Sequence, residues 1–544
     1  MRSMKIHREW EFGLGQADPL KRLLGIVEDR KVNLPHDYMI GSDVYADAPS
    51  GQASGYYNAG VAHYVKEIDI PSDWINDQVF LRLDGAMMNA TVEVNGDKAA
   101  LQHYGYAPFE ADITRFVYPG QKNRFVITVN PSMQPNSRWF SGAGLFRDVE
   151  LVHTPKLHIA FGGLSGYTKK IDYKADGQPE TAYLQVSAEI KNELAESRLA
   201  EVTFALINDK SGETIKTGKM LTQVQPLSVG TAYMTLTVDR PLLWDAEKPD
   251  LYRLQATVRD TGTFKTHMIP NEQSADDTES VLFSIRTVEV DVKNGLRING
   301  RPVKLKGGCL HHDNGPIGAV TMYDAEARKI SKLKEVGFNA IRTTHNPPSS
   351  SLIEACDRLG MYVFDEAFDA WGMGKQPGDY SQFFETDWEK DLTAFVKRDR
   401  CHPCVVIWST GNEITERGGL GEGYAWAVKL ADALRRLDPS RPISNGICSF
   451  WNGLDEFIQQ EQMHKLKEQS QTGGLQNADI GGKYDLLWEK YTEAFTAENY
   501  GKGQFTSYQG KALAVVRSGY EAGVAKLTVS AEGLGQAEIC LPVI

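Results

Sequence analysis

A carboxylic acid beside an amide, just after an apolar run, is the clearest chemical signal in this sequence of 544 residues. Residues 405–408 read Val-Val-Ile-Trp, and Asn412-Glu413 follows closely. A carboxyl group at the end of a strand can exchange a proton with a bound substrate, and an adjacent amide can hold a hydroxyl group. Partial burial beside Trp408 would favour the neutral acid. We therefore predict that Glu413 is a general acid/base and that Asn412 binds substrate.

Glycoside hydrolysis is a reaction that suits this pair, but it needs a second carboxyl group. One carboxyl group protonates the leaving oxygen, while the other attacks the anomeric carbon or activates water. Glu498, in the segment Ala-Glu-Asn-Tyr-Gly, is the one nearby candidate for the nucleophile. No apolar strand precedes it, so a plain polar loop remains the alternative interpretation of this segment.

The region that must position these groups, residues 293–500, alternates apolar runs with helical repeats. We predict strands at 303–307, 339–342, 362–366 and 405–408, and helices at 325–336, 351–359, 388–400 and 423–437. Such alternation with short links indicates a parallel sheet. Polar residues gather just after the strands, as expected at the catalytic face of a (β/α)8 TIM barrel. A doubly wound sheet is the alternative, but no Gly-rich phosphate loop follows the first strand.

The segments on either side of this region have the alternating pattern of β-structure. Residues 1–155 predict a jelly-roll β-sandwich with strands at 79–84, 90–94 and 125–129 and a hairpin turn at Asn95-Gly96. Residues 156–292 predict an immunoglobulin-like β-sandwich with strands at 184–190, 202–206 and 254–258 and an exposed loop at 271–280. Residues 501–544 predict a C-terminal β-sandwich fragment with strands at 512–516 and 525–529. The expected fold class is therefore multidomain, β plus α/β.

Composition excludes some classes of function. The net charge is −12 and no basic stripe is present, which argues against a nucleic-acid partner. No apolar run is long enough to cross a membrane, so we expect no membrane partner. The first twelve residues lack the apolar core of a signal peptide. The expected location is cytoplasmic, or periplasmic or secreted if a signal was removed.

Several segments together make the chain similar to glycoside hydrolase family 2, the β-galactosidase/β-glucuronidase family. These are residues 34–38, 137–147, 307–313, 339–348, 365–371 and 400–413. The resemblance covers roughly residues 5 to 495. It implies a retaining exo-β-glycosidase acting on a β-linked oligosaccharide or glycoside, with β-galactosidase first and β-glucuronidase or β-mannosidase as alternatives. The sequence leaves a homo-oligomer open.

The resemblance also implies roles for individual residues. Glu413 would be the acid/base and Asn412 would contact the sugar 2-hydroxyl. Further sugar contacts would come from His311, His345, Asp369 and Trp371, with Trp451 as an aromatic wall, and Arg342 would orient the nucleophile. Each of these residues also has a purely structural interpretation, as a packed side chain or a rim ion pair.

The chain departs from the family pattern in two places. The family nucleophile follows the seventh strand, and it is not found here. The barrel region is about 200 residues where about 250 are typical, so we expect a missing segment at a seam near 495–507. A non-catalytic carbohydrate-binding protein is therefore an alternative from another class. Some members hold Mg²⁺ just after the third strand, where this chain has Ala370 and Gly372; we expect no metal and no other cofactor.

Overall fold

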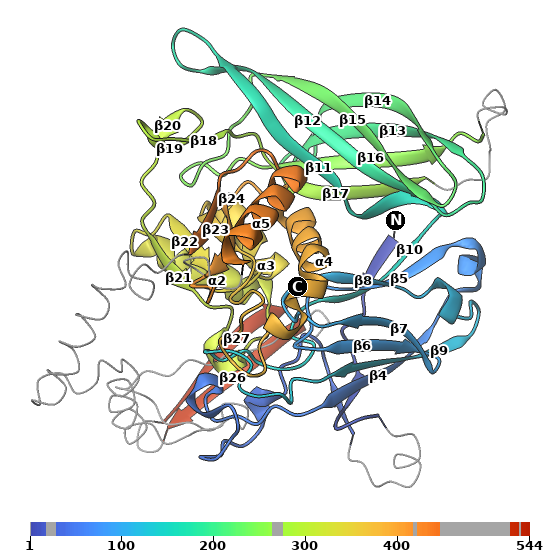
Figure 1. The fold of residues 1–544 in the computed structure, drawn as a ribbon, viewed down its shortest axis with the longest axis vertical. Coiled ribbons are helices and arrows are strands. Elements are labelled where there is room, and N and C mark those ends of the chain that lie inside the picture. The colour runs from blue at the N-terminus through green and yellow to red at the C-terminus, as the bar shows by residue number, and fades with distance from the viewer. Residues whose placement is uncertain are drawn as a thin grey trace, which may run out of the picture.

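The computed structural model describes residues 2–17, 29–263, 276–416 and 422–446, together with the backbone of β26 (Gly523–Ala531) and β27 (Gly535–Val543) (Figure 1). The last two strands form an antiparallel pair, which confirms the strand predicted at 525–529. The strand predicted at 512–516, the seam near 495–507, Trp451 and Glu498 lie outside the described residues.

The first β-sandwich pairs a six-stranded sheet with a four-stranded sheet. The six-stranded sheet, in the order β3-β2-β4-β9-β6-β7, contains β2 (Trp10–Leu14), β3 (Arg30–Val32), β4 (Ala62–Asp69), β6 (Ala90–Val94), β7 (Asp97–Gln102) and β9 (Lys122–Val129). The other sheet, in the order β1-β10-β5-β8, contains β1 (Arg2–Lys5), β5 (Gln78–Leu83), β8 (Phe109–Asp112) and β10 (Val149–Thr154). Asn95 and Gly96 turn between β6 and β7 with φ of 56° and 96°, which confirms the predicted hairpin.

The second β-sandwich pairs a three-stranded sheet with a four-stranded sheet. Its strands are β11 (Leu157–Tyr173), β12 (Pro179–Asn192) and β15 (Ser228–Asp239) on one side, and β13 (Arg198–Asn208), β14 (Thr214–Val224), β16 (Tyr252–Asp260) and β17 (Asp277–Phe283) on the other. The exposed loop predicted at 271–280 is wrong from Asp277 onward. Asp277 is buried and its carboxylate accepts a hydrogen bond from the Ile159 amide (2.8 Å), so an acidic residue begins a strand here.

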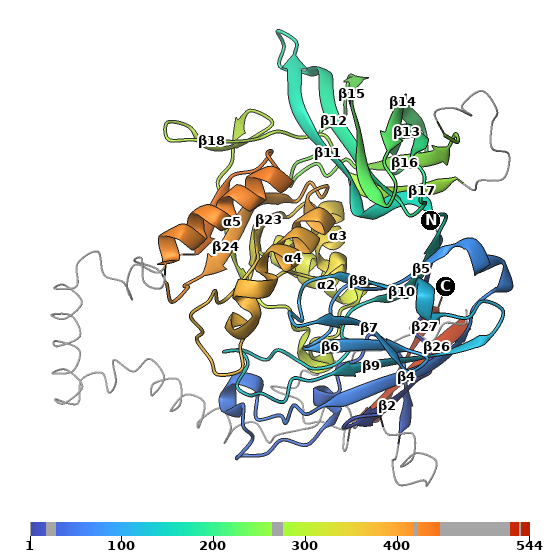
Figure 2. The same ribbon diagram turned by 45° about the vertical axis from the view of Figure 1, so that its right-hand side comes forward.

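A five-stranded parallel sheet carries the helices. Its order is β21 (Gly307–Leu310), β22 (Ala340–Thr343), β23 (Tyr362–Glu366), β24 (Val405–Asn412) and β25 (Ile443–Gly446). The helices are α2 (Tyr323–Glu335), α3 (Ser350–Leu359), α4 (Ser381–Asp399) and α5 (Gly423–Leu437), and a small sheet of β18 (Val288–Asp291), β19 (Gly295–Ile298) and β20 (Arg301–Pro302) precedes them. Figure 2 shows the helices lying together along this sheet. Within the described residues the sheet is open, with β21 and β25 at its edges.

The first strand of this sheet differs from its prediction. We predicted a strand at 303–307, but β21 begins only at Gly307. The Asn339 side chain accepts a hydrogen bond from the Lys306 amide (2.7 Å) and donates one to the Lys304 carbonyl (3.1 Å). Because a side chain satisfies these backbone groups, the segment needs no strand partner. The other predicted strands and helices of the sheet region are present, although α4 begins seven residues earlier than the sequence indicated.

Buried polar contacts join the first sandwich to the sheet region. The Arg147 side chain has no exposed surface and donates hydrogen bonds to the Tyr106 and Pro347 carbonyls, both at 2.8 Å. Gln102 donates to the Asp391 carboxylate on α4 (2.7 Å). The first sandwich is therefore fixed against the sheet and can contribute side chains to its edge. No helix among the described residues combines the length and apolarity needed to cross a membrane.

Candidate active site

The polar residues predicted at strand ends come together at the carboxyl edge of the parallel sheet. His311 follows β21, His345 follows β22, Asp369 follows β23 and Glu413 follows β24. The ring centroids of His311 and His345 are 5.4 Å apart. This gathering is expected because parallel strands all present their carboxyl ends at one edge.

A buried ion pair forms the base of the site. Arg342 donates hydrogen bonds of 2.6 to 3.0 Å to both carboxylate oxygens of Glu366, which has no exposed surface. His345 Nδ1 lies 3.1 Å from the same carboxylate, and the Ser409 hydroxyl donates to it at 2.8 Å. Bidentate contacts of this kind fix both partners. The predicted role of Arg342 toward a nucleophile stays a prediction, because Glu498 lies outside the described residues.

Asn412 is held from both ends of its amide. Its Nδ2 donates to Asp369 Oδ1 and its Oδ1 accepts from Arg342 Nη2, both at 2.8 Å. The residue is only 2% exposed. An amide has two N–H donors and two acceptor lone pairs, so one of each remains for a hydroxyl group. The orientation of Asn412 is therefore fixed before any substrate arrives.

Asp369 is paired with two further cations of the site, Arg138 and Lys375. Its Oδ1 accepts from Arg138 Nη2 (2.9 Å) and from Lys375 Nζ (2.8 Å). Burial raises the pKa of Asp369, but Lys375 and Arg138 outweigh this effect and the net pKa is lowered. Burial lowers the pKa of Lys375 despite its contact with Asp369. Asp369 is thus held as an anion that supports Asn412.

Neither Arg138 nor Lys375 was singled out from the sequence. Arg138 belongs to the motif at 137–147, which resembles the family, but nothing in the motif shows that the first sandwich reaches the sheet. Lys375 follows Asp369 by six residues in a loop without periodic pattern. Only the folded chain shows that both cations converge on one carboxylate.

Glu413 differs from the other carboxylates because its side chain is 37% exposed. Its Oε2 lies 3.8 Å from Arg138 Nη1. Its backbone has a φ of 40° and its amide donates to the Gly446 carbonyl at 2.5 Å. Positive φ at a residue other than glycine is strained and is found often at functional sites. The turn after β24 thus holds Glu413 in a strained backbone conformation with its carboxyl group partly exposed.

Two tryptophans are not where the sequence placed them. Trp408, expected beside Glu413, is fully buried, packs edge-on against Phe395 and donates its indole N–H to Asp438. Side chains alternate along a strand, so Trp408 faces the helices. Trp371, expected to contact the sugar, has no exposed surface and donates its indole N–H to the Thr410 carbonyl (3.0 Å). Both predictions are wrong for the same reason: these indoles are part of the core.

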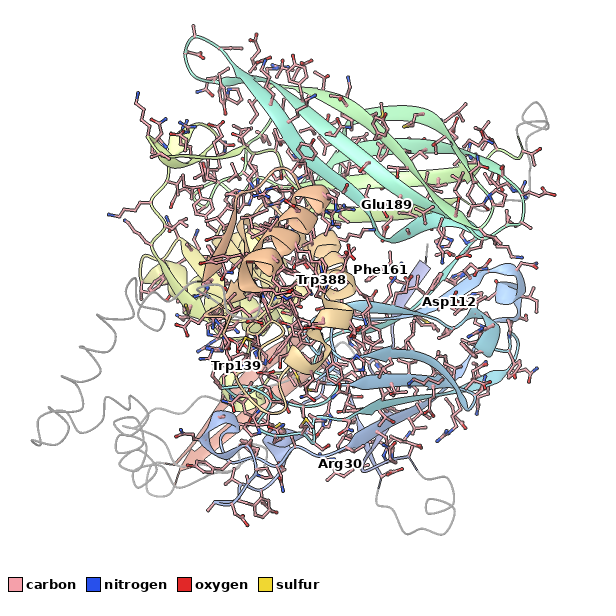
Figure 3. The ribbon with its side chains drawn as sticks, in the orientation of Figure 1. Arg30, Asp112, Trp139, Phe161, Glu189 and Trp388 are labelled. Carbon is pink, nitrogen blue, oxygen red and sulfur yellow. The ribbon has the colours of Figure 1, made fainter. Side chains whose placement is uncertain are left out.

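In the described part of the chain, the first sandwich supplies an aromatic wall of the site. The Trp139 ring centroid lies 5.4 Å from those of both His311 and His345, and its indole N–H donates to the Tyr106 hydroxyl (3.2 Å). Figure 3 labels Trp139 where the first sandwich meets the sheet region. Burial, followed by the neighbouring His345, lowers the pKa of His311. The three rings form a surface of mixed apolar and polar character.

The structure does not test the expectation that the chain uses no metal. Among the described residues, no group of three or more His, Cys, Asp or Glu side chains is arranged to hold an ion. Ala370 is buried, and a side chain built at Gly372 would meet Glu385 and Glu416. The absence of a cofactor stays a prediction.

Comparison with known proteins assigns the family. Three family models match in succession: the glycosyl hydrolases family 2 sugar binding domain at residues 30–155, a further glycosyl hydrolases family 2 model at 167–268, and the family 2 TIM barrel domain at 288–477. The chain belongs to glycosyl hydrolase family 2. The predicted jelly-roll, immunoglobulin-like and barrel architecture is confirmed, with the barrel open in the described part.

Individual relatives agree with this family. A β-galactosidase from Bacteroides ovatus is 33% identical over 432 residues, which are 78% of this chain and 47% of the relative. A solved family 2 structure from Bacteroides cellulosilyticus matches with a TM-score of 0.74 and 32% identity, covering 82% of this chain and 56% of the other. A Bacteroides uniformis β-glucuronidase covalently bound to a cyclophellitol-6-carboxylate aziridine matches with a TM-score of 0.68 and 25% identity, over 84% of this chain and 54% of the other. This family 2 chain therefore spans about half the length of the relatives it matches.

Proposed function

We propose that this chain carries the acid/base half of a retaining exo-β-glycosidase that hydrolyses terminal β-D-galactosides by double displacement. The observation that carries the proposal is the contrast at the carboxyl edge of the sheet. The side chains of Glu366 and Asp369 are 0% and 15% exposed and are held by short contacts to cations. Glu413, whose nearest guanidinium nitrogen is 3.8 Å away, presents a 37% exposed carboxyl group next to Asn412 in the chain. This division separates a positioning network from a carboxyl group that is exposed enough to meet substrate.

In this proposal Glu413 acts twice. Its proton passes to the glycosidic oxygen as the bond to the anomeric carbon breaks, and the nucleophilic carboxylate forms an ester with that carbon. The resulting Glu413 carboxylate then takes a proton from water as the water oxygen attacks and releases the sugar. Glu498 remains the candidate nucleophile. The resemblance to family 2 supplies this order of steps, and the position of Glu413 supports it.

The sugar would lie between Glu413 and the wall formed by Trp139, His311 and His345. Aromatic rings pack well against the apolar face of a sugar, while the histidine nitrogens and the spare Asn412 donor suit its hydroxyl groups. His311 with a lowered pKa is neutral at pH 7 and so suits an uncharged sugar. The similarity to a β-galactosidase supports the same substrate class.

β-Glucuronidase is the second candidate, because the Arg138 side chain is 36% exposed at the site. A guanidinium with open donors could hold a sugar carboxylate. Against this, both of its Nη groups already face carboxylates, Asp369 and Glu413. β-Mannosidase remains an alternative of the same family. A non-catalytic carbohydrate-binding protein built on the same scaffold remains an alternative from another class of function, because the chain spans about half the length of the relatives it matches.

The test is hydrolysis of aryl β-galactoside, β-glucuronide and β-mannoside by the full chain and by Glu413→Gln. Loss of a general acid/base lowers turnover by about 10²–10⁴-fold, so galactoside turnover should fall by that factor. Glu335→Gln, an exposed carboxylate on α2 far from the site in sequence, is the matched control and should keep full turnover. Turnover of the glucuronide instead would favour the second candidate. Binding of galactose without turnover of any glycoside would contradict an enzymatic role.

A further inference from the structure

A polar cavity lies at the opposite end of the parallel sheet from the candidate active site, where the strands begin. It has a volume of about 240 Å³ and lies between β11 and the segment after β17 on one side and the loops that precede β24 and β25 on the other. Figure 1 shows the second sandwich lying along this side of the sheet region. The cavity is therefore at the amino ends of the strands, away from Glu413, and the family resemblance gives it no role.

Arg286 is the buried cation of this cavity. It is only 6% exposed. Its Nε donates to the Pro403 carbonyl and its Nη2 to the Val405 carbonyl, both at 2.6 Å. No carboxylate among the described residues forms an ion pair with it, and its Nη1 has no hydrogen-bond partner there. A buried charge without a counter-ion is costly.

Further positive groups surround the same space. Lys169 is exposed on β11, and no described side chain pairs with it. Arg400 Nε is buried without a hydrogen-bond partner, while its Nη2 donates to the Gly162 carbonyl and lies 3.9 Å from the Glu189 carboxylate. Arg441 is already paired with Asp438. The single carboxylate among the described lining residues is Glu289, which pairs with Arg297 at 2.8 Å.

The balance of charge in the cavity is thus positive. Burial and the neighbouring Arg441 lower the pKa of Arg286 to about 9, so Arg286 is still a cation at pH 7. An anion placed here would supply the missing counter-charge and accept from unused donors. Guanidinium groups suit oxyanions because their N–H groups form a planar fork that matches oxygen spacing.

We propose that this cavity binds a phosphate group, held by Arg286 and Arg400 at its base and by Lys169 at its mouth. The bound group would lie between the second sandwich and the parallel sheet. Because a ligand stabilises the state that binds it, phosphate would also stabilise the junction between these two domains. Arg286 without a ligand would still join the domains through the Pro403 and Val405 carbonyls, and the test must separate these two roles.

The experiment is isothermal titration calorimetry of the full chain with inorganic phosphate and, separately, with glycerol 3-phosphate, at fixed ionic strength set with chloride. Lys169→Glu is the main variant, because Lys169 is exposed and its replacement leaves the packed groups intact. Lys174→Glu, an exposed lysine beyond the end of β11 that does not line the cavity, is the matched control. Arg286→Lys keeps the charge but removes the planar fork.

We expect phosphate binding by the wild type, weakened about tenfold in Lys169→Glu and Arg286→Lys and unchanged in Lys174→Glu. Tighter binding of the free ion or of the ester would identify which source of phosphate the cavity prefers. A wild type that binds neither, or binding that Lys169→Glu leaves unchanged, would overturn the proposal and leave Arg286 as a structural contact. If Arg286→Lys fails to fold, Lys169→Glu alone decides.

Discussion

Arg342 and Arg286 lie at opposite ends of the strands of the parallel sheet and differ in their counter-ions. At the carboxyl edge, Arg342 is paired with Glu366 and Lys375 with Asp369. Where the strands begin, Arg441 is paired with Asp438, but the side chain of Arg286, more deeply buried than Arg342, donates only to carbonyl oxygens among the described residues. Ion pairs fix the positions of Arg342 and Lys375 at the end of the sheet that carries Glu413. Arg286, at the other end, has no carboxylate partner among the described residues, so its positive charge can attract an anion. The difference separates an arrangement that positions side chains from one that can receive a ligand.

The comparison predicts that Glu366→Gln has the largest effect on stability. The substitution keeps the shape of the side chain but leaves Arg342 without its counter-ion, so the free energy of unfolding should fall by about 3 kcal/mol. Urea denaturation measures this change. Glu354→Gln is the control, because Glu354 is 43% exposed in its pair with Arg358 and its loss should cost less than about 1 kcal/mol. Equal losses in both variants would contradict the importance of burial.

Asp369→Asn should have an intermediate effect that depends on pH. At pH 7 it removes the charged acceptor of Lys375 and Arg138, and the free energy of unfolding should fall by about 2 kcal/mol. The pKa of Asp369 is lowered in the folded chain. Its stabilising contribution is therefore complete above its unfolded pKa of about 3.9 and is lost as the pH falls through the lower, folded pKa.

Urea denaturation of wild type and Asp369→Asn between pH 7 and pH 3 measures this dependence. The difference between the two proteins should be constant above about pH 5 and should shrink as the pH falls below about 4. A difference that grows on acidification would show that Asp369 is destabilised as an anion, contrary to its contacts with Lys375 and Arg138.

Arg286→Met should have the smallest effect in phosphate-free buffer. The Val405 carbonyl also accepts from Arg441 Nε (2.7 Å), so only the Pro403 carbonyl would lose its contact with a side chain. The gain from removing an unpaired buried charge offsets that loss, and the free energy of unfolding should change by less than about 1 kcal/mol. Arg441→Met is the comparison at the same edge. Arg441→Met leaves the buried Asp438 without its counter-ion, so the free energy of unfolding should fall nearly as much as in Glu366→Gln. Similar small losses in Arg286→Met and Arg441→Met would contradict the role of pairing.

The sequence predicts the strands and helices of the parallel sheet well because their patterns are local. The apolar run at 405–408 and the helical repeat at 423–437 correspond to β24 and α5 (Gly423–Leu437). The strand predicted at 303–307 is wrong because Asn339, more than thirty residues away in the chain, satisfies the backbone of that segment. A contact of this range leaves no signal in the local pattern.

In the candidate site too, local sequence patterns predict some features, and long-range packing decides the others. Strand ends placed His311, His345, Asp369, Asn412 and Glu413 at one edge, since connectivity alone brings the carboxyl ends of parallel strands together. Which way each side chain points depended on packing. Trp371 and Trp408 face the core, and Trp139 from another domain supplies an aromatic wall in the described part of the site.

The sequence by itself determined the order of domains, the parallel sheet and the position of Asn412-Glu413 at a strand end, because these follow from hydrophobic periodicity and chain connectivity. Only the tertiary structure decided which charges meet. Arg138 and Lys375 converge on Asp369, and Arg286 forms no ion pair with a carboxylate in the described part of the chain, because contacts between distant segments depend on how the domains pack against one another.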